Sequence, residues 1–120
     1  MKGENQSAIL LDHQHFTQGI YSNMIKHIVM FKLATKNQEN MEKAINSLNS
    51  LKIGIETLRF IEVGTDYYGS ERSYDIILVT HFDNNEGLET YRHHKNHIPV
   101  IKTMRELCSS SISVDYEQKP

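Results

Sequence analysis

The chain has 120 residues, of which 38% are hydrophobic, and its 13 Lys and Arg nearly balance its 15 Asp and Glu. This length suits one domain and leaves no room for a second. The charges are scattered, so we expect neither a nucleic-acid-binding stripe nor a membrane-bound helix, and no apolar run approaches the ~20 residues that span a bilayer. The single cysteine, Cys108, excludes an internal disulfide, and we therefore expect a cytoplasmic protein.

The first 23 residues differ in composition from the rest of the chain. They are rich in Gln, Asn, His and Ser and keep neither the helical nor the strand period. We expect residues 1–23 to form a polar N-terminal extension, flexible or non-native, and the domain to occupy residues 24–117.

Regular structure is predicted from residue 25 onward. Alternating side chains predict a strand over 25–33, with His27 on one face and Ile28 and Met30 on the other. Apolar residues at helical spacing over 41–51 then predict an amphipathic helix. Both faces of the strand are largely apolar, so we expect both to be covered.

The remaining elements complete a recognisable order. We expect strands over 57–65, 74–82 and 111–116, a helix capped by Asn84, and a short helix opened by Pro99. The order β-α-β-β-α(α)-β is that of an α+β, ferredoxin-like fold, with a four-stranded antiparallel sheet and helices on one face.

Helices can cover only one face of such a sheet. We expect Ile28, Met30, Ile61 and Val63, with apolar residues of the third strand, to form an apolar surface on the other face. Such a surface needs a partner, and two sheets packed across a two-fold axis would bury it. The sequence therefore predicts a homodimer through the sheet face.

Three of the seven histidines fall in one short segment that opens with Tyr91 and contains His93, His94 and His97. Histidine exchanges protons near neutral pH, and a phenol can donate to a developing oxyanion. His93 and His97 have a metal-ligand spacing of four, but His94 stands where the zinc-protease pattern has Glu. No third ligand is evident, so we expect no metal, and chemistry by Tyr and His would need no other cofactor.

Several blocks of the chain resemble the stress-responsive A/B barrel (Dabb) domain family. They are 25–33 (IKHIVMFKL), 61–64 (IEVG), 74–79 (YDIILV), 88–91 (LETY) with the histidines that follow, and 114–117 (VDYE). The resemblance implies a dimeric α+β barrel. Its members include plant stress proteins, bacterial proteins of unknown role and one plant polyketide cyclase, so the reaction is not implied.

The resemblance to the cyclase implies roles for three residues. The catalytic Tyr and His of that enzyme fall on Tyr91 and His97, and a pocket His falls on His27. Two positions depart from the pattern, because a second pocket His falls on Asp75 and His94 is followed by Lys95 rather than by proline. On this reading His97 is a general base, Tyr91 an oxyanion donor and His27 a residue that orients the ligand.

The same residues also have structural interpretations. His97 can cap the carbonyl end of a helix, Tyr91 can pack on the sheet, and His27 can be a satisfied core residue. We expect His94 to bond the backbone of a turn and His93 to be solvated. One hypothesis is therefore a small organic ligand bound between helices and sheet, with or without cofactor-free catalysis of the cyclase or lyase type by the Tyr/His pair. The other is a dimeric module with structural histidines.

A further alternative is the monooxygenase-like chemistry of other dimeric barrels, oxidation of a phenol or degradation of haem. The absence of tryptophan and of a haem-ligand context makes this reading weaker.

Overall fold

A computed structural model describes residues 23–119. The expected extension therefore lies outside the described residues, except for Asn23. The elements are β1 (Ile25–Leu33), α2 (Gln38–Asn49), a 3-10 turn η1 (Ser50–Lys52), β2 (Phe60–Thr65), β3 (Ile76–Phe82), α3 (Asn85–Arg92), α4 (Ile98–Leu107) and β4 (Cys108–Glu117).

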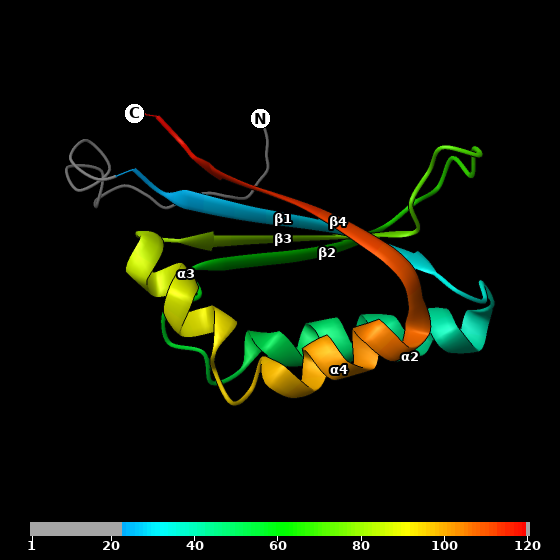
Figure 1. The fold of residues 1–120 in the computed structure, drawn as a ribbon, viewed down its shortest axis with the longest axis horizontal. Helices are drawn as coiled ribbons and strands as arrows, with labels where there is room; N and C mark the ends of the chain where they lie inside the picture. The colour runs from blue at the N-terminus through cyan, green and yellow to red at the C-terminus, as the bar shows by residue number, and fades with distance from the viewer. Residues whose placement is uncertain (1–22, 120) are drawn as a thin grey trace.

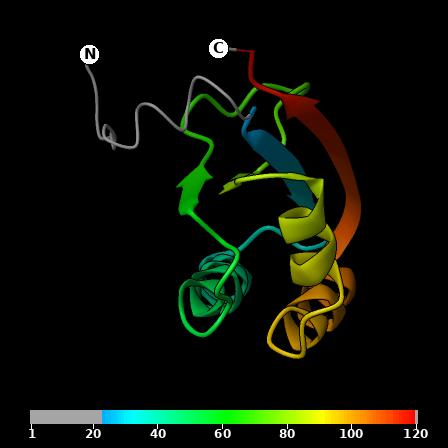
Figure 2. The ribbon, with the colours of Figure 1, turned by 90° about the vertical axis from the view of Figure 1, so that its left-hand side faces the viewer.

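The four strands form one antiparallel sheet in the order β2-β3-β1-β4. The helices lie against one face of this sheet, and no element of residues 23–119 covers the other face (Figures 1 and 2). This is the α+β, ferredoxin-like arrangement predicted from the sequence. Within residues 23–119, no helix is both long and apolar enough to cross a membrane.

Local signals in the sequence set the helix boundaries. The Asn37 side chain accepts a hydrogen bond from the Asn40 amide at the start of α2, and Asn84 accepts one from Gly87 at the start of α3. Pro99 stands in the first turn of α4, where its missing amide hydrogen costs nothing.

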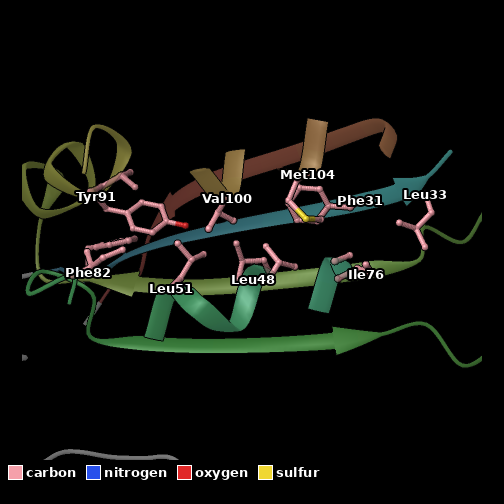
Figure 3. Close-up of a cluster of buried hydrophobic side chains, with 13 residues drawn as sticks. Phe31, Leu33, Leu48, Leu51, Ile76, Phe82, Tyr91, Val100 and Met104 are labelled. Atoms are coloured by element: carbon pink, nitrogen blue, oxygen red, sulfur yellow. The ribbon is translucent and has the colours of Figure 1, made fainter. Parts of the chain in front are cut away.

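The core lies between the helices and the inner face of the sheet. Figure 3 shows side chains from β1, β3, α3, α4 and the end of α2 meeting there. Its buried apolar members include Phe31, Leu48, Leu51, Phe82 and Met104. His27 and Thr80, paired across β1 and β3, are buried on the same inner face.

One prediction about the sheet faces is wrong. Ile61 and Val63 pack against the core, because Ile61 pairs with Thr80 and Val63 with Leu78, whose side chains point toward the helices. The outer face is nevertheless apolar. Alternation along the paired strands places there Phe60, Ile77 and Val79, together with Ile28, Met30, Ile112, Val114 and Tyr116.

The strand ends also differ from prediction. β2 begins at Phe60 rather than at residue 57, because the preceding segment turns through a Leu58 amide to Ile55 carbonyl hydrogen bond. β4 begins directly after α4, at Cys108, where the pairing with β1 shifts register between Lys32 and Leu33. That irregular start borders the cavity described below.

Candidate functional site

Tyr91 and His97 meet where α3 turns into α4. Tyr91 lies in the last turn of α3 and His97 immediately precedes α4. Their rings stack with centroids 4.1 Å apart and an angle of 26° between the planes. The turn between them is fixed by hydrogen bonds from the His97 and Ile98 amides to the His94 carbonyl, at 2.9 and 3.1 Å.

The environment of His97 favours the neutral imidazole. Burial lowers its pKa, although the carbonyls of Arg92 and Tyr91 oppose this shift. Its Nδ1 lies 3.3 Å from the Arg92 carbonyl oxygen, which can only accept a hydrogen bond. We therefore assign the proton to Nδ1, and this tautomer leaves Nε2 as an acceptor. His97 thus caps the carbonyl of Arg92, the last residue of α3, through Nδ1, and keeps Nε2 as an acceptor.

Tyr91 carries a phenol without a partner. Its side chain is fully buried, and its hydroxyl makes no hydrogen bond within the described residues. Burial raises its pKa, so the phenol stays protonated near neutral pH and can only be used as a donor or a neutral acceptor. Figure 3 shows the hydroxyl pointing from α3 toward Val100 and Leu51. An unsatisfied buried hydroxyl is costly, which makes this atom a candidate for binding something.

His27 belongs to a charged network on the same side of the sheet. Its Nδ1 hydrogen-bonds Asp115 Oδ1, and the Arg92 guanidinium donates to Asp115 Oδ2 at 2.6 Å. The pair forms because His27 and Asp115 are directly opposite in the β1–β4 ladder. The Tyr91 and His27 rings are arranged edge to face, with centroids 6.1 Å apart.

The Asp115 carboxylate is ionised in this network. Burial opposes its ionisation, but the hydrogen bonds and charges of His27 and Arg92 outweigh that effect and hold its pKa below the usual range. Because a carboxylate only accepts, His27 must carry its proton on Nδ1. Arg92 therefore joins α3 to β4, and Asp115 fixes the orientation of the His27 ring.

A cavity of about 370 Å³ opens between α2, α4 and the inner face of the sheet. His97 stands on its wall, beside Leu51 and Val100. Tyr91 and His27 do not line it; they lie behind His97 and these apolar residues. The structure thus brings the three predicted site residues into one group, and only His97 is presented to the cavity.

The other predicted positions have structural roles. His94 is in the turn, where its Nδ1 accepts from the Asn96 amide at 3.0 Å, and His93 has 81% of its side chain exposed; both predictions are confirmed. Asp75 lies at the far end of β1, where it accepts from the Leu33 amide at 2.8 Å and pairs with Lys36. No three metal-ligating side chains converge anywhere in residues 23–119.

Sequence reasoning missed three charged residues of the site region. Asp115 and Arg92 were not connected with His27, because the network depends on the pairing of strands that are far apart in the chain. The signal was the polar stripe of Ser111, Ser113 and Asp115, which alternates with Ile112, Val114 and Tyr116. Arg105 lines the cavity. Nothing in the sequence indicated this, apart from its position on a helix that ends beside β4.

The fold and this inner cavity define the protein as a ferredoxin-like α+β domain with a helix-covered sheet. The Stress responsive A/B Barrel Domain matches residues 25–118, and the chain belongs to this family. The resemblance of the sequence blocks is thereby confirmed.

Individual relatives share this architecture. The chain is 28% identical over 99 residues to a stress-response A/B barrel domain-containing protein of Arabidopsis thaliana; the match covers 79% of this chain and 37% of that relative. A dimeric protein of unknown function from Bacteroides fragilis is 33% identical, with a TM-score of 0.62 over 78% of this chain and 95% of the other. A hydroxynitrile lyase from Passiflora edulis is 14% identical, with a TM-score of 0.70 over 80% of this chain and 94% of the other.

Proposed function

We propose that the protein is a homodimeric domain that binds a small organic molecule in the cavity between its helices and its sheet. The observation that carries this proposal is the cavity of about 370 Å³ with His97, whose neutral ring offers one acceptor nitrogen, on an otherwise largely apolar wall. Small-molecule sites are typically concave, mostly apolar and equipped with a few polar groups, and this cavity is at the small end of their size range.

The dimeric part of the proposal rests on the open face of the sheet. Ile112, Val114 and Tyr116 are exposed there beside the half-buried Ile28 and Met30. A continuous apolar face of this kind is typical of an interface. The relative from Bacteroides fragilis, which shares the fold, is dimeric. Together with the lone cysteine, these features fit a cytoplasmic homodimer. In such a dimer the cavity of each protomer lies on its helix side, away from the interface.

Blocking the cavity tests the binding proposal. We expect uncharged compounds such as 1-octanol and benzyl alcohol to raise the melting temperature of the wild-type protein. Ile101→Phe, which adds bulk on the half-buried cavity wall, should abolish that shift. Ile98→Phe, at a 55% exposed position on the same helix, is the matched control and should retain it. Equal shifts in all three proteins would place binding elsewhere.

A second candidate is cofactor-free proton transfer of the lyase or cyclase type. It is favoured by the neutral His97 stacked on a protonated phenol that has no partner, and a hydroxynitrile lyase has the same fold. His97 Nε2 would remove a proton from a substrate oxygen or carbon. The Tyr91 hydroxyl, after a rotation or a small shift toward the cavity, would donate to the oxygen that gains charge.

Cleavage of mandelonitrile to benzaldehyde and cyanide tests this candidate. We expect His97→Ala to lower the rate at least about 100-fold. Tyr91→Phe should also lower it, while leaving the free energy of unfolding unchanged or raising it by up to about 1 kcal/mol, because the lost hydroxyl has no partner. A wild-type rate equal to that of buffer, or equal rates in all three proteins, would remove mandelonitrile cleavage by this pair.

A further inference from the structure

Among the described residues that line the cavity, Arg105 is the only one with a permanent charge, and none is acidic. Arg105 lies in the last turn of α4, exposed at the cavity mouth. Arg59 and Arg92 each pair with a carboxylate, whereas Arg105 forms no salt bridge with a described residue. A cation without a counter-ion, at the mouth of an apolar cavity, is placed to receive an anion.

Two carbonyls at the end of α4 have partners other than the Arg105 side chain. An arginine in the last turn of a helix often donates hydrogen bonds to the carbonyls that have no partner within the helix. Here the Met104 carbonyl accepts from the Cys108 amide, and the Leu107 carbonyl accepts from the Ala34 amide at 2.9 Å. The Arg105 guanidinium is therefore available for a ligand.

A hydroxyl on β4 supplies a second polar group at the mouth. Ser109, Ser110 and Ser111 all line the cavity. Ser109 donates to the Lys32 carbonyl and Ser110 to the Tyr74 hydroxyl. Ser111 is paired with Phe31, so its side chain points to the helix side, and its hydroxyl makes no hydrogen bond with a described residue.

The rest of the wall is apolar. Val29, Phe31, Leu48, Leu78 and Met104 line the interior beyond the mouth. We propose that the ligand is an organic carboxylate with an apolar body, its carboxylate held by Arg105 and Ser111 and its body lying along these side chains toward His97. This inference rests on the proposed binding function and adds the chemical class of the ligand.

A matched pair of probes separates the charge from the apolar body. Octanoate and octanamide have the same chain, and only octanoate is an anion. We expect the wild-type protein to bind octanoate about five- to tenfold more tightly than octanamide, as measured by calorimetry with amide chemical shifts of the cavity residues as a second readout. Added salt should weaken the binding of octanoate and leave that of octanamide unchanged.

Arg105→Gln is the decisive variant. It should bring octanoate down to the affinity of octanamide without changing octanamide binding, because it removes only the charge. Lys102→Gln removes one positive charge from an exposed site on the same helix and should preserve the preference. Arg105 is exposed, so Arg105→Gln is expected to fold; its melting temperature without ligand checks this.

Two outcomes would overturn the inference in distinguishable ways. If octanoate and octanamide bind the wild-type cavity equally, or if Arg105→Gln keeps the preference, the assignment of a carboxylate to Arg105 is wrong while small-molecule binding stands. If neither probe shifts the cavity amides, and the uncharged compounds also fail to stabilise the protein, the binding function itself is wrong.

Discussion

His97 and His81 are both driven toward the neutral form, but on opposite faces of the sheet. His97 lies on the helix side, where burial lowers its pKa. His81 lies on the outer face, stacked on Phe60 with ring centroids 4.4 Å apart. Burial, and then the charge of Lys26, lower the pKa of His81 from 6.5 to about 4. Each ring therefore resists protonation for a local reason, and each couples folding to pH.

Replacement of His81 should flatten the pH dependence of stability. Below pH 6.5 the unfolded chain binds a proton at His81 that the folded protein does not bind until about pH 4. The free energy of unfolding should therefore fall as the pH is lowered through this window, and His81→Gln should fall less steeply. Urea titrations from pH 7 to pH 4, at one protein concentration, measure the slopes.

His93→Gln is the control for this experiment, because it removes a histidine whose side chain is 81% exposed. If His81→Gln and the wild-type protein show parallel pH profiles, His81 is not the group that couples folding to protons.

For single residues, the sequence indicated well which side chains carry chemistry, but it indicated less well what each of them contacts. The grouping of Tyr91 and His97 followed from their closeness in one segment and from the proline after it. The His27–Asp115 pair could not be predicted in this way, because it depends on the register in which β1 pairs with β4. A shift of that register by one residue would turn Asp115 to the other face of the sheet.

Helix α3 shows how a short element can hold the site together. It has only eight residues, yet it carries Tyr91 into the core and Arg92 onto Asp115. Helices of this length are unstable alone, so its position depends on its cap and its packing. The cap is the Asn84 side chain, which accepts from the Gly87 amide at 2.8 Å.

Loss of that cap should loosen α3 selectively. We expect Asn84→Ala to lower the free energy of unfolding by about 1 kcal/mol and to speed hydrogen exchange of the amides in α3. Asn37→Ala removes the equivalent cap of α2 and should cost a similar amount without faster exchange in α3. Equal exchange of α3 amides in both variants would mean that packing alone, and not the cap, holds this helix.

The elements themselves were predictable because their signals are local. Alternation predicted β1 and β4, a run of β-prone residues predicted β3, and Asn84 and Pro99 marked where α3 and α4 start. The inward face of β2 was not predictable. Phe60 and Ile61 are both apolar, so the pattern does not show which of them points toward the core. Packing decides it: Ile61 and Val63 complete the core, whereas Phe60 turns outward to stack on His81.

The two faces of the sheet carry the two proposed properties of the molecule, ligand binding on the helix side and dimerisation on the outer face. The helix side holds the cavity, with His97 and Arg105 on its wall, and the buried His27, which does not line the cavity, belongs to the same side. The outer face has no cover in the described chain, and Figure 2 shows it turned away from the helices. A dimer through this face leaves both cavities accessible, because the interface and the cavities are on opposite sides of the same sheet. The proposed assembly and the proposed binding can therefore be changed separately.

A charge in the centre of the outer face should separate the protomers. Val79 lies on β3 between Ile28 and Glu62 of the flanking strands, and all three point outward. In Val79→Lys, the new ammonium can pair with Glu62 across the strands, which preserves the monomer fold. Burial of the same charge between two sheets would be costly.

We therefore expect light scattering at micromolar concentration to give twice the 13.9 kDa chain mass for the wild-type protein and one chain mass for Val79→Lys. Ile98→Lys, at an exposed position on the helix side, should remain dimeric. Since the cavity faces away from Val79, monomeric Val79→Lys should still bind the cavity probes. A dimeric Val79→Lys, or a monomeric wild-type protein, would show that the outer face is not the interface.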